Sequence, residues 1–182
     1  MDTMRPILMN GNMIELTPFQ QKDFNRLIGW IGSKELLTTI AGNLWSYPLT
    51  IAQLQLYVED PKSYSFNIVE TPHDLVIGHA EIILADDGSC KIDKLLVDPA
   101  HRGKGLCPPV IKRLLAYAFD KLPVHTTELN VFDWNTAGIR CYERSGFSFN
   151  PEKKQLFSLD DKTWTAINMS ITKERFLSMD ER

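Results

Sequence analysis

The stretch that decides the fold runs from residue 95 to residue 109 and reads LLVDPAHRGKGLCPP. An apolar run ends at Asp98-Pro99, and two prolines follow a pair of glycines almost at once. Proline is favoured in the first turn of a helix, where backbone N–H groups have no intrahelical partner. We therefore expect a strand, a glycine-containing loop and the start of a helix, in this order.

The loop has the composition of an anion-binding site. Gly103 and Gly105 let the backbone turn tightly and approach a ligand closely. Arg102 and Lys104 add positive charge beside the N-terminus of the expected helix, where unpaired N–H groups and the helix dipole also favour an anion. The whole chain has a net charge of −3, so such a site must be local rather than part of a basic surface.

Three phosphate-binding patterns compete for this loop. A P-loop reads GxxxxGK[ST], but Lys104 is followed by Gly105, so this pattern fails. A dinucleotide fingerprint reads GxGxxG, and Pro108 stands where the third glycine belongs. The third pattern is Arg/Gln-x-x-Gly-x-Gly/Ala after a strand that reads V-x-P, and residues 97–107, VDPAHRGKGLC, follow it with Cys107 in the last position.

Length and composition narrow the class of protein. A chain of 182 residues, 43% hydrophobic and 24% charged, is expected to form a single globular domain over residues 1–182. The three cysteines are widely spaced, which suggests neither zinc nor a disulfide framework and fits a reducing compartment. The sequence shows no signal peptide and no apolar run of membrane-spanning length, so we expect a cytoplasmic protein that binds neither membrane nor nucleic acid.

Periodicity and turn residues predict an α/β chain without internal repeats. Capping boxes at Thr17 and Thr50 indicate two helices, and Asn135 is expected to cap a helix that ends before Gly146. Strict alternation over residues 91–97 would place Asp93, Leu95 and Val97 on one face of a strand. The other expected strands are 14–16, 64–70, 75–85, 128–134, 155–159 and 164–171, and a fourth helix is expected from about 108 to 122.

A second motif follows the glycine loop at a distance of thirty residues. Residues 129–147 read LNVFDWNTAGIRCYERSGF, a strand followed by a helix of the form N-x-x-A/S-I-x-x-Y-E-K-x-G-F. Together the two motifs resemble the GNAT superfamily of N-acetyltransferases, and residues 44–50, LWSYPLT, resemble its RimJ/RimL-like branch. The resemblance implies an α/β (α+β) fold with a central, mixed, mostly antiparallel sheet of about six to seven strands and about four flanking helices.

The resemblance also implies a reaction and a co-substrate. Members of this superfamily transfer an acetyl group from acetyl-CoA to a primary amine by direct attack in a ternary complex, without a metal. The backbone of Leu95, Leu96 and Val97 would pair with the pantetheine arm, and Asn135 would contact that arm or cap its helix. The pyrophosphate would lie on the loop formed by Arg102, Gly103, Lys104, Gly105, Leu106 and Cys107.

The resemblance suggests candidates for the acid and the base. Tyr142 matches a tyrosine that points at the thioester sulfur, and a neutral phenol can donate a proton there. Its spacing from Ile139 is equally that of ordinary helix packing. Asp93 is one candidate base and Glu81 is its rival, although either can be a solvated residue or an ion-pair partner of a nearby lysine, and water can replace both.

The motif departs from the family pattern at the start of the helix. Cys107 replaces a smaller residue, and Pro108 and Pro109 each remove a backbone N–H from the helix N-terminus. A catalytically weak or inactive GNAT domain that binds CoA or a partner is therefore the alternative to an enzyme. The acceptor stays open among a protein N-terminus, an aminoglycoside, a polyamine and another small amine, and the chain is expected to be a monomer or a homodimer.

Overall fold

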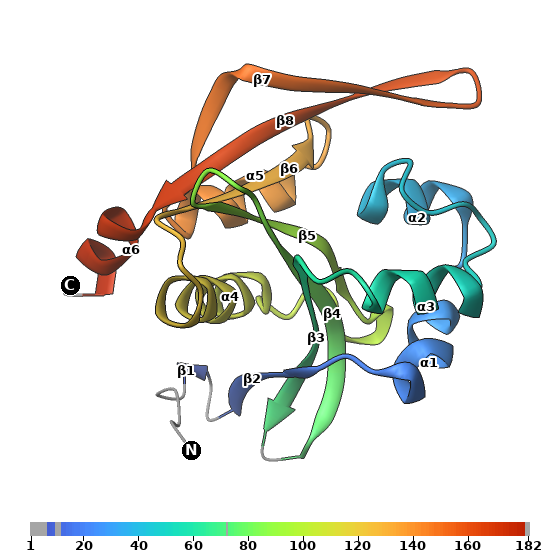
Figure 1. Ribbon diagram of the computed structural model, residues 1–182, viewed down its shortest axis with the longest axis horizontal. Helices are drawn as coiled ribbons and strands as arrows, with labels where there is room; N and C mark the ends of the chain where they lie inside the picture. The colour runs from blue at the N-terminus through green and yellow to red at the C-terminus, as the bar shows by residue number, and fades with distance from the viewer. Residues whose placement is uncertain (1–6, 10–11, 72, 181–182) are drawn as a thin grey trace.

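One mixed sheet organises the chain. The structure is a computed structural model that describes residues 7–9, 12–71 and 73–180. Its eight strands follow the order β1-β2-β3-β4-β5-β6-β8-β7, and only the β5–β6 pair is parallel (Figure 1). The strands are β1 (Ile7–Met9), β2 (Asn12–Pro18), β3 (Ser63–Thr71), β4 (Leu75–Leu84), β5 (Ser89–Val97), β6 (Thr126–Phe132), β7 (Ser148–Leu159) and β8 (Lys162–Thr172).

Six α-helices accompany the sheet in the described part of the chain. They are α1 (Phe24–Trp30), α2 (Lys34–Ala41), α3 (Ile51–Val58), α4 (Cys107–Lys121), α5 (Thr136–Arg144) and α6 (Lys173–Asp180). Two 3₁₀ turns, Gln21–Asp23 and Pro99–His101, complete the set. None of these helices is long and apolar enough to cross a membrane. The mixed, mostly antiparallel architecture confirms the expected fold class, with more strands and helices than the sequence indicated.

Two apolar clusters hold the elements together. The larger cluster joins the sheet to α4, with Ile68, Ile82, Leu114 and Met169 fully buried. The smaller cluster joins α1, α2 and α3 through Phe24, Leu27, Leu37 and Leu54, and it reaches β5 at Leu96. In Figure 1, α4 lies away from the group formed by α1, α2 and α3, and β5 runs between them. The strand β5 therefore contributes to both clusters.

The helix ends follow local side-chain chemistry with one exception. Thr50 caps α3 by accepting a hydrogen bond from the backbone N–H of Gln53 at 3.3 Å, and Gly146, at φ +93°, follows the end of α5, as predicted. The predicted capping box at Thr17 was wrong, because that residue lies in β2 and pairs with Asn67 of β3. Helix α1 begins seven residues later, after a 3₁₀ turn whose Asp23 carboxylate accepts from the backbone N–H of Gln20 at 3.0 Å.

A bulge in β5 changes the faces that its side chains occupy. Asp93 pairs with Glu81 and Leu96 pairs with His79, so two residues of β5 face one residue of β4 between these pairs. Lys94 accommodates the extra residue at φ +47°. The prediction that Asp93 shares a face with Leu95 and Val97 was therefore wrong, because the bulge places Asp93 with Leu96, toward α1–α3. Strict alternation holds only for a strand without a bulge.

Candidate active site

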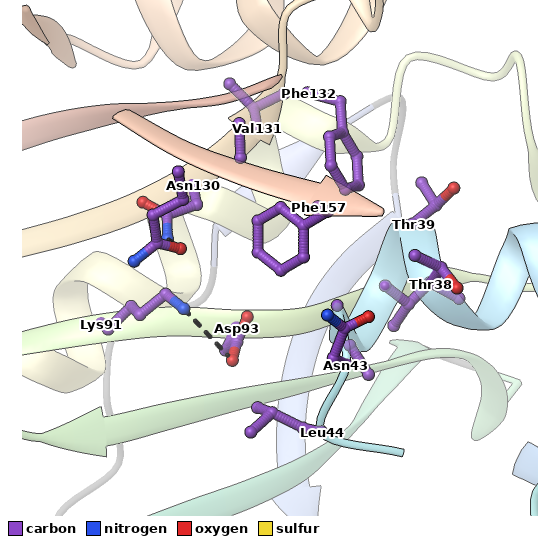
Figure 2. A pocket seen from close by; sticks show the side chains of 15 residues that line it. Thr38, Thr39, Asn43, Leu44, Lys91, Asp93, Asn130, Val131, Phe132 and Phe157 are labelled. Atoms are coloured by element: carbon purple, nitrogen blue, oxygen red, sulfur yellow. Dashed lines mark hydrogen bonds and ion pairs between the residues drawn. The ribbon is translucent and has the colours of Figure 1, made fainter. Parts of the chain in front are cut away.

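Two adjoining cavities lie where β5 and β6 separate. The larger has a volume of about 360 Å³ and lies between α2, β5, β6 and the β7–β8 hairpin (Figure 2). The smaller, of about 80 Å³, is lined by β5 and β6 together with Asn135 and Tyr142. Both cavities are lined by Thr39, Ile40, Asp93, Asn130, Val131 and Phe132, so they adjoin, and together they are called the passage below.

The passage exists because a parallel pairing stops early. Residues Ser89–Ile92 of β5 pair with Thr126–Leu129 of β6, and the pairing ends there. Beyond this point the β5 bulge and the β6 end diverge, and Leu95 lines the smaller cavity while the side chain of Leu96 is buried among α1–α3. The β5 edge from Leu95 to Val97 is thus placed to pair with an extended ligand as an added strand would.

The loop after β5 has the predicted strand–loop–helix arrangement. Asp98 anchors it by accepting from the backbone N–H of Ala100 at 3.0 Å, and the Arg102 Nε donates to the Val97 carbonyl oxygen at 3.0 Å. Gly103 and Gly105 have φ values of +74° and +73°, a region that other residues rarely adopt. Lys104 is exposed beside them, and the side chain of Leu106 packs on the larger apolar cluster before α4 begins at Cys107.

A disulfide joins this loop to the next helix of the site. The prediction that the cysteines form no disulfide was wrong, because Cys107 and Cys141 are bonded with their Cα atoms 6.2 Å apart. They are separated by 34 residues, and only the packing of α5 against α4 brings them together. The cysteine content therefore no longer argues for a reducing compartment. Cys90 stays a free, buried thiol.

Tyr142 and Asn135 are both positioned by α5. The Asn135 Oδ1 caps the helix by accepting from the backbone N–H of Gly138 at 3.0 Å. The half-buried phenol of Tyr142 lines the smaller cavity, and burial raises its pKa to about 12. The group is therefore a neutral donor near pH 7. Its ring also lies 6.1 Å from that of Phe147, so it contributes to packing as well.

Of the two candidate bases, only Asp93 lines the cavities. Its side chain is 15% exposed and lines both, and its Oδ2 lies 3.4 Å from Lys91 Nζ and 3.6 Å from Lys94 Nζ. Glu81 lies opposite Asp93 on β4, is 2% exposed and lines neither cavity. It accepts hydrogen bonds from Lys94 and Ser63, and burial raises its pKa. Either residue's role as a base stays a prediction.

Lys94, which the sequence offered only as a possible ion-pair partner of Asp93 or Glu81, is buried beside both. Its ammonium is 5% exposed, pairs with Glu81, and lies 5.4 Å from the ring centre of Trp45 and 5.1 Å from that of Tyr57. The Tyr57 hydroxyl is also 3.0 Å from Nε2 of His79, a buried imidazole. Burial and the nearby Lys94 lower the pKa of His79 to about 3, so it is neutral at pH 7 and has a structural position.

The outer wall of the larger cavity is formed by α2, which the sequence analysis did not predict, and by the β7–β8 hairpin, which it did. Helix α2 and the turn after it contribute Thr38, Thr39, Asn43 and Leu44, and Figure 2 shows them across the cavity from Lys91 and Asp93. The hairpin contributes Phe157, and a Cβ at Gly42 would lie only 2.6 Å from its ring. Glycine at position 42 thus lets the hairpin close against α2.

The glycine loop, the free edge of β5 and the cavities lined by Tyr142 and Asp93 thus lie together around the end of β5. The profile of the Acetyltransferase (GNAT) family matches residues 30–147. The chain belongs to that family, as the two motifs indicated.

Curated relatives match shorter parts of the chain. The Probable N-acetyltransferase YjcK of Bacillus subtilis (strain 168) is 28% identical over 99 residues, which cover 53% of this chain and 55% of YjcK. The Spermine/spermidine N(1)-acetyltransferase of the same organism is 32% identical over 66 residues, which cover 36% of this chain and 43% of that protein. The chain thus spans about half the length, or less, of these two relatives.

A solved structure matches nearly the whole fold. The crystal structure of spermidine N-acetyltransferase from Vibrio cholerae, in complex with CoA and spermine, has a TM-score of 0.78 to this chain at 20% sequence identity. The match covers 90% of this chain and 98% of that one. This likeness confirms the fold predicted from the motifs. These matches support the family and not its RimJ/RimL-like branch in particular, so the narrower assignment stays a prediction.

Proposed function

We propose that the chain transfers an acetyl group from acetyl-CoA to a primary amine by direct attack in a ternary complex. The observation that carries the proposal is the passage itself, because Tyr142 lines its cofactor end and Asp93 lines both ends. Relatives named as polyamine acetyltransferases support an amine acceptor. We also propose that residues 1–182 form one domain, since strands on both sides of the matched segment complete a single sheet.

The residues present fit the co-substrate. The left-handed glycines at 103 and 105, with Arg102 and Lys104 beside them, suit a pyrophosphate at the α4 N-terminus. The β5 edge from Leu95 to Val97 suits the amide groups of an extended pantetheine arm. Pro108 and Pro109 lie in the first turn of α4, where the N–H groups they lack would have no intrahelical partner.

The proposed chemistry places one proton transfer at each end of the passage. A neutral amine attacks the thioester carbonyl carbon, a C–N bond forms and the C–S bond breaks. Asp93, or a water molecule next to it, accepts the proton that the new amide nitrogen loses. Tyr142 donates its proton to the departing thiolate and recovers one from solvent. Glu81, buried beneath Lys94 and outside both cavities, is the weaker candidate for the base.

Two measurements on the purified protein test the proposal. Calorimetric titration with acetyl-CoA, using dephospho-CoA and ATP as comparison ligands, reports the cofactor site. Release of the CoA thiol in the presence of a panel of primary amines reports transfer. Acetyl-CoA binding with amine-dependent thiol release is the expected result. Binding without amine-dependent release would support the alternative of an inactive CoA-binding domain, and no binding would reject the assignment of the loop.

A further inference from the structure

The acceptor cavity contains little net charge. Among the described residues that line it, Lys91 and Asp93 are the two with a charged side chain, and they are paired. The other polar lining groups are the hydroxyls of threonines and the amides of Asn43, Asn130 and Gln155. The cavity therefore offers one carboxylate, one ammonium and several neutral hydrogen-bonding groups.

The carboxylate of Asp93 already has two cationic neighbours. Lys94 is fixed in place, because its buried ammonium pairs with Glu81 and lies against the rings of Trp45 and Tyr57. Lys91 is held less tightly, with a side chain that is 35% exposed and a distance of 3.4 Å to Asp93. Lys91 is therefore the partner of Asp93 that a ligand can displace.

Two acidic residues outside the cavity lining, Glu128 and Asp160, are paired as well. Glu128, whose register partner is Lys91, binds Lys153 at 2.6 Å and Asn168 at 3.2 Å. Asp160, at the tip of the β7–β8 hairpin, pairs with Lys34 at the start of α2. A polyamine keeps at least one further ammonium after its reacting nitrogen loses a proton. Among the described residues that line this cavity, that charge would find no carboxylate other than Asp93, which Lys91 already pairs.

We infer that the acceptor is an amine that also carries an acidic group a few atoms away, as an amino acid does, and that Lys91 selects it. This inference rests on the proposed function. The acceptor's amine takes the place of Lys91 beside Asp93, and its acidic group pairs with the displaced Lys91 ammonium. The exchange leaves each charge with a partner, and the surrounding amides bind the remaining polar atoms of a molecule that fits about 360 Å³.

Probe pairs that differ by one carboxylate test the inference. Lysine is compared with 1,5-diaminopentane, and ornithine with 1,4-diaminobutane, with spermidine as the polycation and acetyl-CoA saturating. We expect kcat/KM to be about tenfold or more higher for the carboxylate-bearing member of each pair. Equal or higher values for the diamines or spermidine would overturn the inference.

Substitutions of Lys91 distinguish a role in choosing the acceptor from a general loss of activity. Lys91→Met is expected to remove the preference by lowering kcat/KM for lysine much more than it changes the value for 1,5-diaminopentane, and Lys91→Glu is expected to reverse the preference. Lys62→Met is the matched control, because Lys62 is also a half-exposed lysine paired with an aspartate, Asp86, but lines neither cavity. An equal loss for both amines in Lys91→Met would argue against selection by this residue.

Failure of the inference is distinguishable from failure of the proposed function. If acetyl-CoA binds but none of the proteinogenic amino acids is acetylated, the inferred acceptor class is wrong and the cofactor assignment stands. If acetyl-CoA does not bind, the proposed function itself is wrong.

Discussion

Loss of the Cys107–Cys141 disulfide should lower the free energy of unfolding by about 4 kcal/mol. The bond closes a loop between residues 34 apart, and the loop-closure expression gives an entropy of about 13 cal/mol/K for a loop of this length, or about 4 kcal/mol at 25 °C. The perturbation is Cys107→Ser, which removes the bond at the half-buried first residue of α4 and avoids placing a polar group at buried Cys141.

The assay is urea unfolding at equilibrium, with and without dithiothreitol. The free energy of unfolding of wild-type protein without reductant should exceed that of reduced wild-type protein and that of Cys107→Ser by the same amount, because both of these lack the disulfide. Cys107→Ser itself should not respond to reductant, since its remaining cysteines, Cys90 and Cys141, form no bond. Mass spectrometry after thiol alkylation verifies the bond in each sample.

A difference below about 1 kcal/mol between oxidised and reduced wild-type protein would refute this reasoning. It would mean that the packing of α5 on α4 fixes the two cysteines without the bond. The same samples have a functional readout, because Cys141 directly precedes Tyr142 and Cys107 ends the glycine loop. Weaker acetyl-CoA binding in the reduced protein is expected, and its absence would show that the loop and α5 keep their positions independently.

Three further changes probe the site and its surroundings. Gly105→Glu should abolish acetyl-CoA binding in calorimetry, because it puts a carboxylate against the expected pyrophosphate at a φ of +73°. The control Gly29→Glu, in open space on α1, should keep binding. Retained micromolar affinity in Gly105→Glu would reject the loop assignment. Tyr142→Phe should lower kcat by about 10²-fold with little change in the Kd of acetyl-CoA, and an unchanged kcat would remove the phenol from the mechanism. Acidification should destabilise the fold through His79, whose folded pKa of about 3 lies below the unfolded value of 6.5. The unfolded chain therefore takes the proton first, and the free energy of unfolding falls as pH drops below 6.5. The loss reaches about 3 kcal/mol at pH 4.5, and urea unfolding of His79→Gln should show a correspondingly smaller loss between pH 7 and pH 4.5 than wild type does.

The parts of the site predicted from sequence are those fixed by local backbone chemistry. Gly103 and Gly105 mark a loop that needs left-handed backbone, and Asn135 caps α5, whereas Tyr142 was identified by its match to the family motif. Each signal involves residues within a few positions of one another. Such signals do not depend on tertiary contacts, so the strand, the loop and the helix could be predicted before their packing was known.

The parts that were missed depend on distant contacts. Cys107 and Cys141 meet because α4 and α5 pack together, and the spacing of the cysteines in the sequence does not predict this pairing. Helix α2 had a usable signal in Ser33, whose hydroxyl accepts from the backbone N–H of Leu36 at 3.1 Å, followed by buried Leu37 and Ile40. The signal is weak because the helix has only two turns, and its place beside the acceptor cavity depends on the β7–β8 hairpin.

A single inserted residue in β5 connects the cofactor side of the site with its acceptor side. Without the bulge at Lys94, Asp93 and Leu95 would share a face, and Leu95 rather than Leu96 would pair with His79. The same bulge turns Lys94 under Trp45 and Tyr57, where its ammonium reaches both Glu81 and Asp93. Lys94 lines the smaller cavity and lies 3.6 Å from Asp93, and the next three residues of the strand, from Leu95 to Val97, are those proposed to pair with the cofactor. A change of acceptor class within this fold can thus come from the side chains around the bulge and leave the glycine loop and α5 untouched.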